Sequence, residues 1–247
     1  MEYVLSPYQW GLALFAGFIL GLSKAGIKGI SVLLVTIMAL AFGGRASTGI
    51  LVPMLIAGDI FAVWYYNRHA QWSYLYRLLP WVLLGVLMAV WIGKDIPEAF
   101  FKQLMAFILL GSVALMLWWE RQKDRQIPTQ TWFAAAMGWG AGFTTMIGNL
   151  AGPIANIYFL ATRLPKDQFI GTAAWLFFIV NIFKLPFHIF VWKTITYDSL
   201  VLNLKLLPGI ALGLWVGIHL VKAIKDQQYR YLILFLTAVG AIAIFFR

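Results

Sequence analysis

Ten apolar runs, each ended by charges or by proline and glycine, occupy most of the 247 residues of the sequence. A helix needs roughly 20 apolar residues to span a bilayer, and 62% of this chain is hydrophobic while only 11% is charged. That composition is too apolar for a water-soluble domain of this size. The sequence therefore predicts an all-α polytopic membrane protein embedded in the lipid bilayer. The runs lie near residues 9–22, 30–42, 49–66, 75–93, 101–119, 132–147, 150–161, 169–192, 200–222 and 229–246.

Two pairs of runs are too short to span the bilayer, and each pair is joined by a glycine-containing polar stretch instead of a charged loop. The first joint is Ser23–Gly29 and the second is Thr144–Pro153. Such joints are typical of interrupted helices. Unwound backbone is tolerated in lipid only where it is buried in protein or lines a cavity, because each unpaired N–H or C=O costs several kcal/mol. We therefore expect both joints to lie inside the protein, facing each other.

The second half of the chain repeats the first at a slowly drifting offset, as divergent repeats do. The long charged connection Glu120–Gln130 separates the two halves. We predict a first membrane repeat over residues 1–119, a linker loop over 120–131 and a second membrane repeat over 132–247. The matched residues are Gly17 with Gly138, Gly21 with Gly142, Gly49 with Gly171, Asp59 with Asn181, Pro80 with Pro208, Gly85 with Gly213 and Gly111 with Gly240.

The distribution of lysine and arginine favours an inverted orientation of the two repeats. If each short pair crosses twice, or re-enters, each half has an odd number of crossings, and ten cations lie on one face against six on the other. If each short pair formed one broken spanning helix, the count would be eight against eight. Cytoplasmic loops are enriched in lysine and arginine. We therefore expect a cytoplasmic linker loop, both termini outside and, as the setting, a bacterial cytoplasmic (inner) membrane.

The two joints combine the groups that bind an oxyanion. Half-helix N-termini with free N–H groups attract anions, lysines supply charge, and hydroxyl and amide groups supply donors. Glycines let the backbone approach the ion closely. Two structural alternatives stay open: the lysines could snorkel to the headgroups, and the hydroxyls could bond back to their own helix. The predicted substrate-binding residues are Ser23, Lys24, Lys28, Thr144, Thr145 and Asn149, with Gly26, Gly29, Gly148 and Gly152.

Four further polar residues, Asp59, Asn181, Lys184 and His188, lie within runs that should be deep in the membrane. An unpaired charge at such depth costs about 2.5–3.5 kcal/mol on insertion scales, so Lys184 needs a partner or a cavity. One interpretation is a structural ion pair between Asp59 and Lys184. The other assigns these residues to substrate or proton handling, and on it we predict a coupling or gating role for all four.

Several function classes lack the residues that they require. The chain has no cysteine, which excludes disulfides, thiol catalysis and cysteine-ligated metal centres. It contains no HExxH or GxSxG motif and no pair of acids within one apolar run, which argues against an enzyme. Its net charge of +10 comes from cations spread between apolar runs, whereas nucleic-acid binders gather them on one face. We expect no cofactor, no metal site and no nucleic-acid partner.

The joints and the segment around Asp59 give the sequence a family resemblance. The segments that show the resemblance are GFILGLSKAGIKG (17–29), FGGRASTGILVPMLIAGDIFAVWYYNRHA (42–70) and AGFTTMIGNLAGP (141–153). In these segments the chain resembles the TauE/SafE family of sulfite exporters and organosulfonate transporters, and the likeness covers nearly its whole length. The resemblance implies a carrier of sulfite, sulfonates, thiosulfate or related small anions.

The repeat and the joints together predict a secondary transporter, because inverted repeats with interrupted helices recur in such proteins around a midplane site. Our hypothesis is alternating access, with the anion held by Lys24, Asn149, Thr144 and Thr145. Export is favoured because a monoanion leaves a negative interior downhill by about 2.3 kcal/mol per 100 mV. The alternatives are an anion channel with the joints as its constriction and a proton-coupled importer that uses Asp59. The sequence leaves a homodimer open.

Overall fold

The computed structural model describes residues 5–120, 131–225, 228–229, 231–232 and 235. All regular structure within these residues is helical. The predicted run 229–246 falls almost entirely outside them. The helices are α1 (Pro7–Lys24), α2 (Ser31–Phe42), α3 (Gly44–Tyr66), the 3₁₀ turn η1 (Asn67–His69), α4 (Trp72–Gly93), α5 (Glu98–Glu120), α6 (Thr131–Gly148), α7 (Ala151–Ala161), α8 (Lys166–Pro186), the π-helical turn η2 (Phe187–Val191) and α9 (Tyr197–Ala223).

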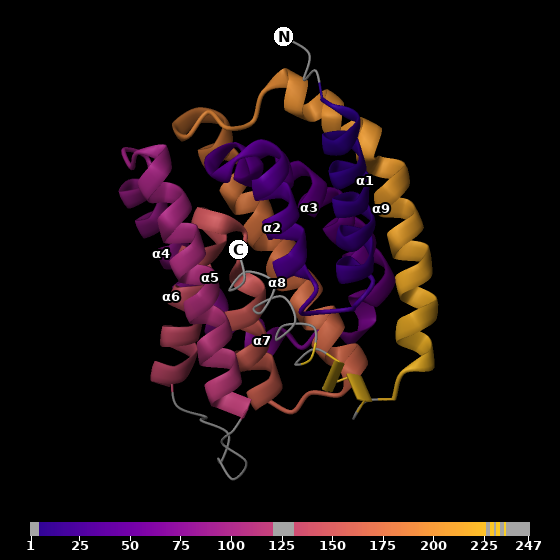
Figure 1. Cartoon of the computed structure of the whole chain (residues 1–247). Coiled ribbons are helices and arrows are strands. Elements are labelled where there is room, and N and C mark those ends of the chain that lie inside the picture. The colour runs from indigo at the N-terminus through magenta and orange to yellow at the C-terminus, as the bar shows by residue number, and fades with distance from the viewer. Residues whose placement is uncertain (1–4, 121–130, 226–227, 230, 233–234, 236–247) are drawn as a thin grey trace.

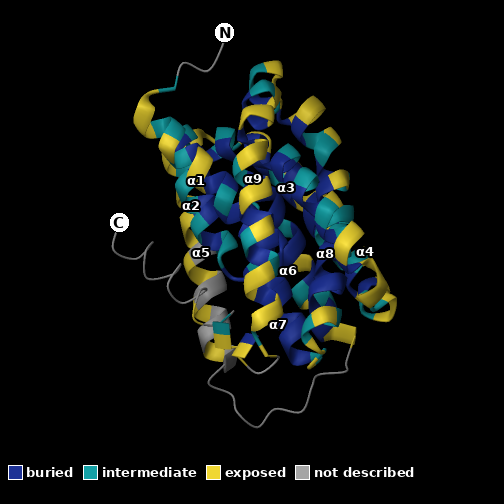
Figure 2. Cartoon of the chain, turned by 90° about the vertical axis from the view of Figure 1, so that its right-hand side faces the viewer, coloured by how far each residue is buried: buried dark blue, intermediate teal, exposed yellow. Residues whose placement is uncertain are grey.

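Within the described ranges, four stretches of helix are long and apolar enough to cross a membrane: Gly44–His69, Trp72–Gly93, Lys166–Val191 and Tyr197–Ala223. Helices α2 and α7 are apolar but short. Large apolar side chains such as Trp64, Trp91 and Trp215 are exposed on the outer surface of the bundle, and Figure 2 shows the buried residues gathered inside. An apolar exterior around a packed interior suits lipid contact. The prediction of an all-helical membrane protein is thus confirmed.

The first helices of both short pairs are longer than their apolar runs predicted. Helix α1 begins at Pro7 because Ser6 caps it, and the Ser6 and Gln9 side chains form a reciprocal capping box. Helix α6 has the same length, 18 residues. The helical breaks are correspondingly narrower than the predicted joints: they cover residues 25–30 and 149–150. Hydropathy marks the apolar part of a helix, whereas capping and backbone geometry fix where it ends.

Each short pair returns to the face from which it starts. Gln9, near the start of α1, donates from Nε2 to the Ala41 carbonyl at the end of α2, over 3.1 Å. Phe133, near the start of α6, stacks on Tyr158 in α7, with ring centroids 6.1 Å apart. Figure 1 shows α1 and α2 entering from the upper face and α6 and α7 from the lower face. Both breaks therefore lie in the interior.

Two helix pairs, α1 with α9 and α4 with α6, pack with their backbones in direct contact. Glycines on every one of these helices allow the approach, because an added Cβ would overlap a carbonyl oxygen of the neighbouring helix. The same reciprocal arrangement holds both pairs. The glycines and the residues whose carbonyls they meet are Gly21 with Ile210 and Gly213 with Phe18 for α1 and α9, and Gly142 with Val82 and Gly85 with Trp139 for α4 and α6.

Candidate functional site

The two breaks meet at a cavity of about 40 Å³, which we call the central pocket. Residues from the middle of α3 and α8 also line the pocket. Four fifths of its lining residues come from the two short pairs and their breaks. The polar members of the lining are Ser23, Lys24, Lys28, Ser31, Thr145, Asn149, Asn156 and Asn181. The pocket therefore holds two lysines and is rich in hydrogen-bonding side chains.

The N-termini of α2 and α7 open onto the central pocket. Ser31 at the start of α2, and Ala151 and Gly152 at the start of α7, belong to its lining. Neither helix has a side-chain cap hydrogen bond at its N-terminus. The first N–H groups of a helix carry partial positive charge and lack intrahelical partners. Two such ends directed at one cavity suit an anion.

The chain breaks at these points because of residues that adopt positive φ angles. Gly26 and Gly29 have φ angles of 122° and 94°, and Asn149 has a φ of 56°. Glycine reaches this region without steric cost, and asparagine enters it more readily than most residues. These three residues therefore end α1 and α6 and change the direction of the chain. Helices α2 and α7 consequently begin at the pocket.

A buried ion pair lies on one side of the pocket. The Lys24 ammonium donates to Asp59 Oδ1 over 2.5 Å, and the Asn181 amide donates to the other carboxylate oxygen over 2.7 Å. Both oxygens of Asp59 are thus occupied, and the residue is fully buried. The interpretation in which Asp59 pairs with Lys184 is therefore wrong, because α1 places Lys24 against the carboxylate.

Lys184 instead binds the end of α6. Its ammonium donates to Asn149 Oδ1 at 2.7 Å, to Thr145 Oγ1 at 3.0 Å and to the Thr145 carbonyl at 3.2 Å. The C-terminal end of a helix carries partial negative charge, which favours a cation there. Asn149 also donates from Nδ2 to the Thr48 carbonyl over 3.1 Å. This lysine therefore fixes the second break without a carboxylate.

Lys28 is the pocket lysine whose ammonium has no hydrogen bond to any residue that the structure describes. It is buried, with 4% of its surface exposed. Its Nζ lies over the ring of Phe177, 5.6 Å from the ring centroid. Lys24 lies 5.4 Å from the same ring. A buried ammonium with only a cation–π contact is poorly compensated.

The structure brings most of the predicted binding residues to the pocket but leaves three of them outside its lining. Ser23, Lys24, Lys28, Gly29, Thr145, Asn149 and Gly152 line it, together with Asn181 from the predicted gating set. Thr144 bonds back to the Gly140 carbonyl of its own helix over 2.8 Å, which is the alternative that its position left open. Gly26 and Gly148 shape the breaks without lining the cavity.

His188 lies in the π-helical turn after α8, one turn beyond Lys184. Its Nδ1 shares a 2.8 Å hydrogen bond with Thr194 Oγ1. Its Nε2 is buried and has no hydrogen-bond partner among the described residues. His188 does not line the pocket, and no three metal-binding side chains cluster within the described part of the chain.

Asn156 is one of the pocket residues that sequence reasoning missed. It is 1% exposed, and its Oδ1 has no hydrogen-bond partner within the described ranges. The available signal was its position: it is the one amide side chain within the apolar run 150–161. A buried polar group without a partner costs about 1–3 kcal/mol, so an amide there calls for a ligand or water.

The whole chain was compared with known proteins. It matches the family described as Sulfite exporter TauE/SafE over residues 10–244. No curated protein and no solved structure matched it. The family is one of membrane transporters of sulfur anions and not of enzymes, so the sequence-based predictions of family and of a non-enzymatic role are confirmed. This integral membrane protein therefore belongs to the TauE/SafE sulfite exporter family.

Proposed function

We propose that this protein carries a small sulfur oxyanion, of the sulfite, sulfonate or thiosulfate class, across the cytoplasmic membrane and binds it in the central pocket. The observation that carries the proposal is the convergence of two helix N-termini and an uncompensated buried lysine on one cavity. Backbone N–H groups and an ammonium in a low-dielectric site bind anions strongly. The family supports an anion as the cargo.

Lys28 is the anchor of the anion in this proposal. The sequence favoured Lys24, but the Lys24 charge is already balanced by Asp59 at 2.5 Å. Lys184 is held by the end of α6. Lys28 lines the pocket and has no hydrogen-bonded partner in the described structure. An anion there gains the most from Lys28, because this ammonium gives up no other hydrogen bond to bind it.

Two inverted repeats underlie the transport cycle that we propose. Asp59 and Asn181, equivalent by sequence, bond to each other at the contact of α3 and α8. Gly49 at the start of α3 lies against Thr194, after α8, and Gly171 near the start of α8 lies against Tyr66 at the end of α3. The two helices thus run antiparallel. This reciprocity supports a pseudo-twofold axis between Asp59 and Asn181.

The matched glycines of the other helices support the same axis. Gly21 and Gly142 are equivalent, and each meets a carbonyl of the fourth helix of the opposite repeat. Two halves with this relation can exchange roles, so that the pocket opens first to one side and then to the other. Alternating access therefore follows as the proposed mechanism, with a carrier favoured over a channel.

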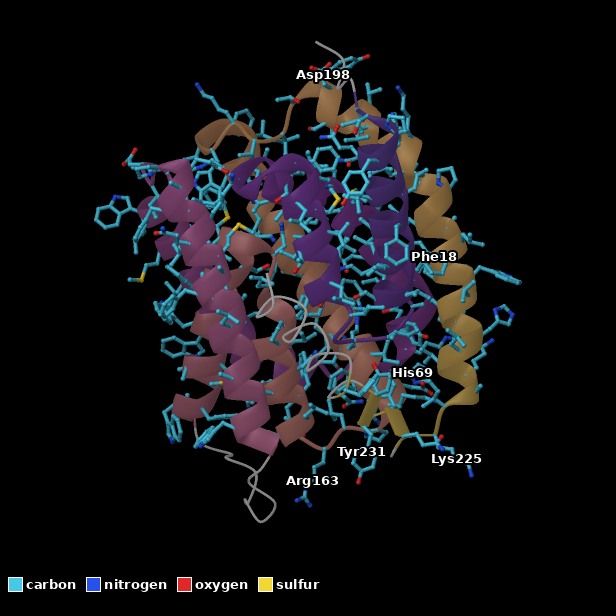
Figure 3. The ribbon with its side chains drawn as sticks, viewed as in Figure 1. Phe18, His69, Arg163, Asp198, Lys225 and Tyr231 are labelled. Atoms are coloured by element: carbon cyan, nitrogen blue, oxygen red, sulfur yellow. The ribbon has the colours of Figure 1, made fainter. Side chains whose placement is uncertain are left out.

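We place the lower face of Figure 1 in the cytoplasm, and export as the favoured direction. His69, Arg163 and Lys225 lie at that face and Asp198 at the opposite one (Figure 3). Cytoplasmic faces are enriched in lysine and arginine. An anion leaves a negative interior downhill. Proton-coupled import through Asp59 is disfavoured because Lys24 and Asn181 occupy both of its oxygens.

Replacing Lys28 with methionine is expected to raise the concentration of sulfite for half-maximal flux on the order of 10- to 100-fold. A hydrogen bond to a charged group contributes about 1.5–3 kcal/mol, and each 1.4 kcal/mol is about tenfold in affinity. Sulfite flux into proteoliposomes containing the purified protein measures the effect. Lys28→Arg should retain part of the activity, because the charge stays.

Lys94→Gln is the matched control for Lys28→Met. Lys94 lies at the end of α4, and its side chain is 44% exposed. Its Nζ lies 3.7 Å from Asp95 Oδ2. Removing its charge should leave sulfite flux as in wild type. If Lys28→Met and wild type reach half-maximal flux at the same sulfite concentration, Lys28 is not the anchor of the anion.

Counterflow separates a carrier from a channel. Vesicles preloaded with unlabelled sulfite should accumulate external ³⁵S-sulfite transiently above its equilibrium level. A carrier exchanges unlabelled sulfite from the inside for labelled sulfite from the outside. A channel lets both populations equilibrate without such an overshoot. Absence of an overshoot together with unitary conductance in a planar bilayer would replace the carrier with a pore.

A further inference from the structure

We propose that Phe177 limits the length of the anion that the central pocket accepts, so that compact inorganic oxyanions enter and sulfonates with an extended alkyl tail are excluded. This inference rests on the proposed function and deepens it by naming a specificity-determining residue. Neither the family match nor the polar pattern of the joints pointed to an aromatic side chain at this position.

The size of the cavity sets the first limit. The central pocket measures about 40 Å³, and a single water needs about 10–15 Å³ on this measure. It therefore holds about three waters, or one compact ion made of sulfur and its oxygens. An alkyl chain attached to that ion exceeds this volume and would have to extend past the residues that line the pocket.

Phe177 lines the pocket beside the two ammonium groups that would meet the charged head of the ion. Its ring lies 5.6 Å from the Lys28 ammonium and 5.4 Å from that of Lys24. Of the side chains that line the pocket it is the largest. Phe177 is also one helical turn before Asn181, which holds Asp59 from the same face of α8. A head group at Lys28 thus has the aromatic ring directly beside it.

The ring has two effects on a bound ion. Its face carries partial negative charge, which attracts the two ammonium groups and holds them in place. The same face repels a sulfonate oxygen, so the ion's oxygens turn toward the helix N-termini, and a tail directed at Phe177 would meet the bulk of its ring. Phe177 therefore excludes tails by bulk and orients heads by charge.

The test compares sulfonates of increasing chain length as competitors of sulfite. Wild type, Phe177→Ala and Phe177→Leu would be assayed for inhibition of ³⁵S-sulfite flux by methanesulfonate and propanesulfonate. We expect propanesulfonate to inhibit Phe177→Ala at concentrations on the order of 10- to 100-fold lower than it needs for wild type, as added space in a pocket for methylene groups allows. Phe177→Leu should fall between the two.

Phe178→Ala is the matched control. Phe178 is the next residue on α8, is partly buried to a similar degree and does not line the pocket. It should keep the wild-type preference. Equal inhibition of wild type by both sulfonates, or the same widening in Phe178→Ala as in Phe177→Ala, would overturn the assignment.

A second readout separates this inference from the proposed function. The same anions would be added to detergent-purified protein, and the shift of its unfolding temperature would report binding without transport. Stabilisation of wild type by sulfite but not propanesulfonate, and of Phe177→Ala by both, supports Phe177 as the limit even where no flux is seen. Absence of flux with this binding pattern contradicts only the transport proposal. Stabilisation of wild type by propanesulfonate contradicts the role of Phe177.

Discussion

Replacing Asp59 with leucine is expected to lower the free energy of unfolding by about 3–5 kcal/mol, the usual cost of removing one partner of a buried ion pair. The carboxylate is fully buried and accepts from Lys24 at 2.5 Å and from Asn181 at 2.7 Å. Its removal leaves the Lys24 ammonium buried without a counter-charge. Thermal unfolding of the purified protein in detergent, followed by intrinsic tryptophan fluorescence, measures the loss.

The double variant Lys24→Met/Asp59→Leu tests the cause of that loss. Apolar side chains of similar volume often replace a buried ion pair at no cost, so the double variant should recover most of the stability. The unfolding temperature of Lys184→Met provides a further comparison, because the Lys184 ammonium contacts only uncharged oxygens. If the double variant unfolds at as low a temperature as Asp59→Leu, the ion pair is not the source of the effect.

Replacing Gly142 with alanine is expected to destabilise the protein by about 3 kcal/mol, at the upper end of the range for inserting a methyl group into a packed contact. The new Cβ would overlap the Val82 carbonyl oxygen and lie 2.9 Å from the Val82 Cα. Backbone atoms cannot rotate aside, so α4 and α6 must separate. The unfolding temperature and the elution profile in size-exclusion chromatography report the change.

Gly11→Ala is the control for that substitution. Gly11 lies in α1, and a Cβ there would meet nothing within 4 Å. Alanine in an open helical position stabilises by roughly 0.5–1 kcal/mol relative to glycine. An unchanged unfolding temperature for Gly142→Ala would show that α4 and α6 do not approach as closely as the structure has them.

The positions of the helical breaks could be predicted from local chemistry. Gly26, Gly29 and Asn149 adopt positive φ angles, and a residue in that conformation cannot continue a right-handed helix. The lengths of α1 and α6 could not be predicted in the same way. Ser6 and Pro7 extend α1 beyond its apolar run through capping, which hydropathy does not register.

The partners of the buried charges could not be predicted. Among the described residues, three lysines and one carboxylate are buried, and spacing along the chain allowed Asp59 to pair with Lys184. The pair that forms joins Lys24 to Asp59 across 35 positions of sequence. Helical periodicity gives the face on which a side chain lies but not the helix that it meets, so only the packing of α1 against α3 decided it.

The sequence by itself determined the membrane class, the family and the two interrupted pairs, because lengths of apolar runs and glycine-rich breaks act through the chain's own backbone and its transfer into lipid. The tertiary structure alone decided that Lys28 has no hydrogen-bonded partner among the described residues and that Asn156 and Phe177 line the pocket. These properties depend on distances between helices far apart in sequence. Such distances are set by how glycine-lined backbones pack against each other, which no local pattern records.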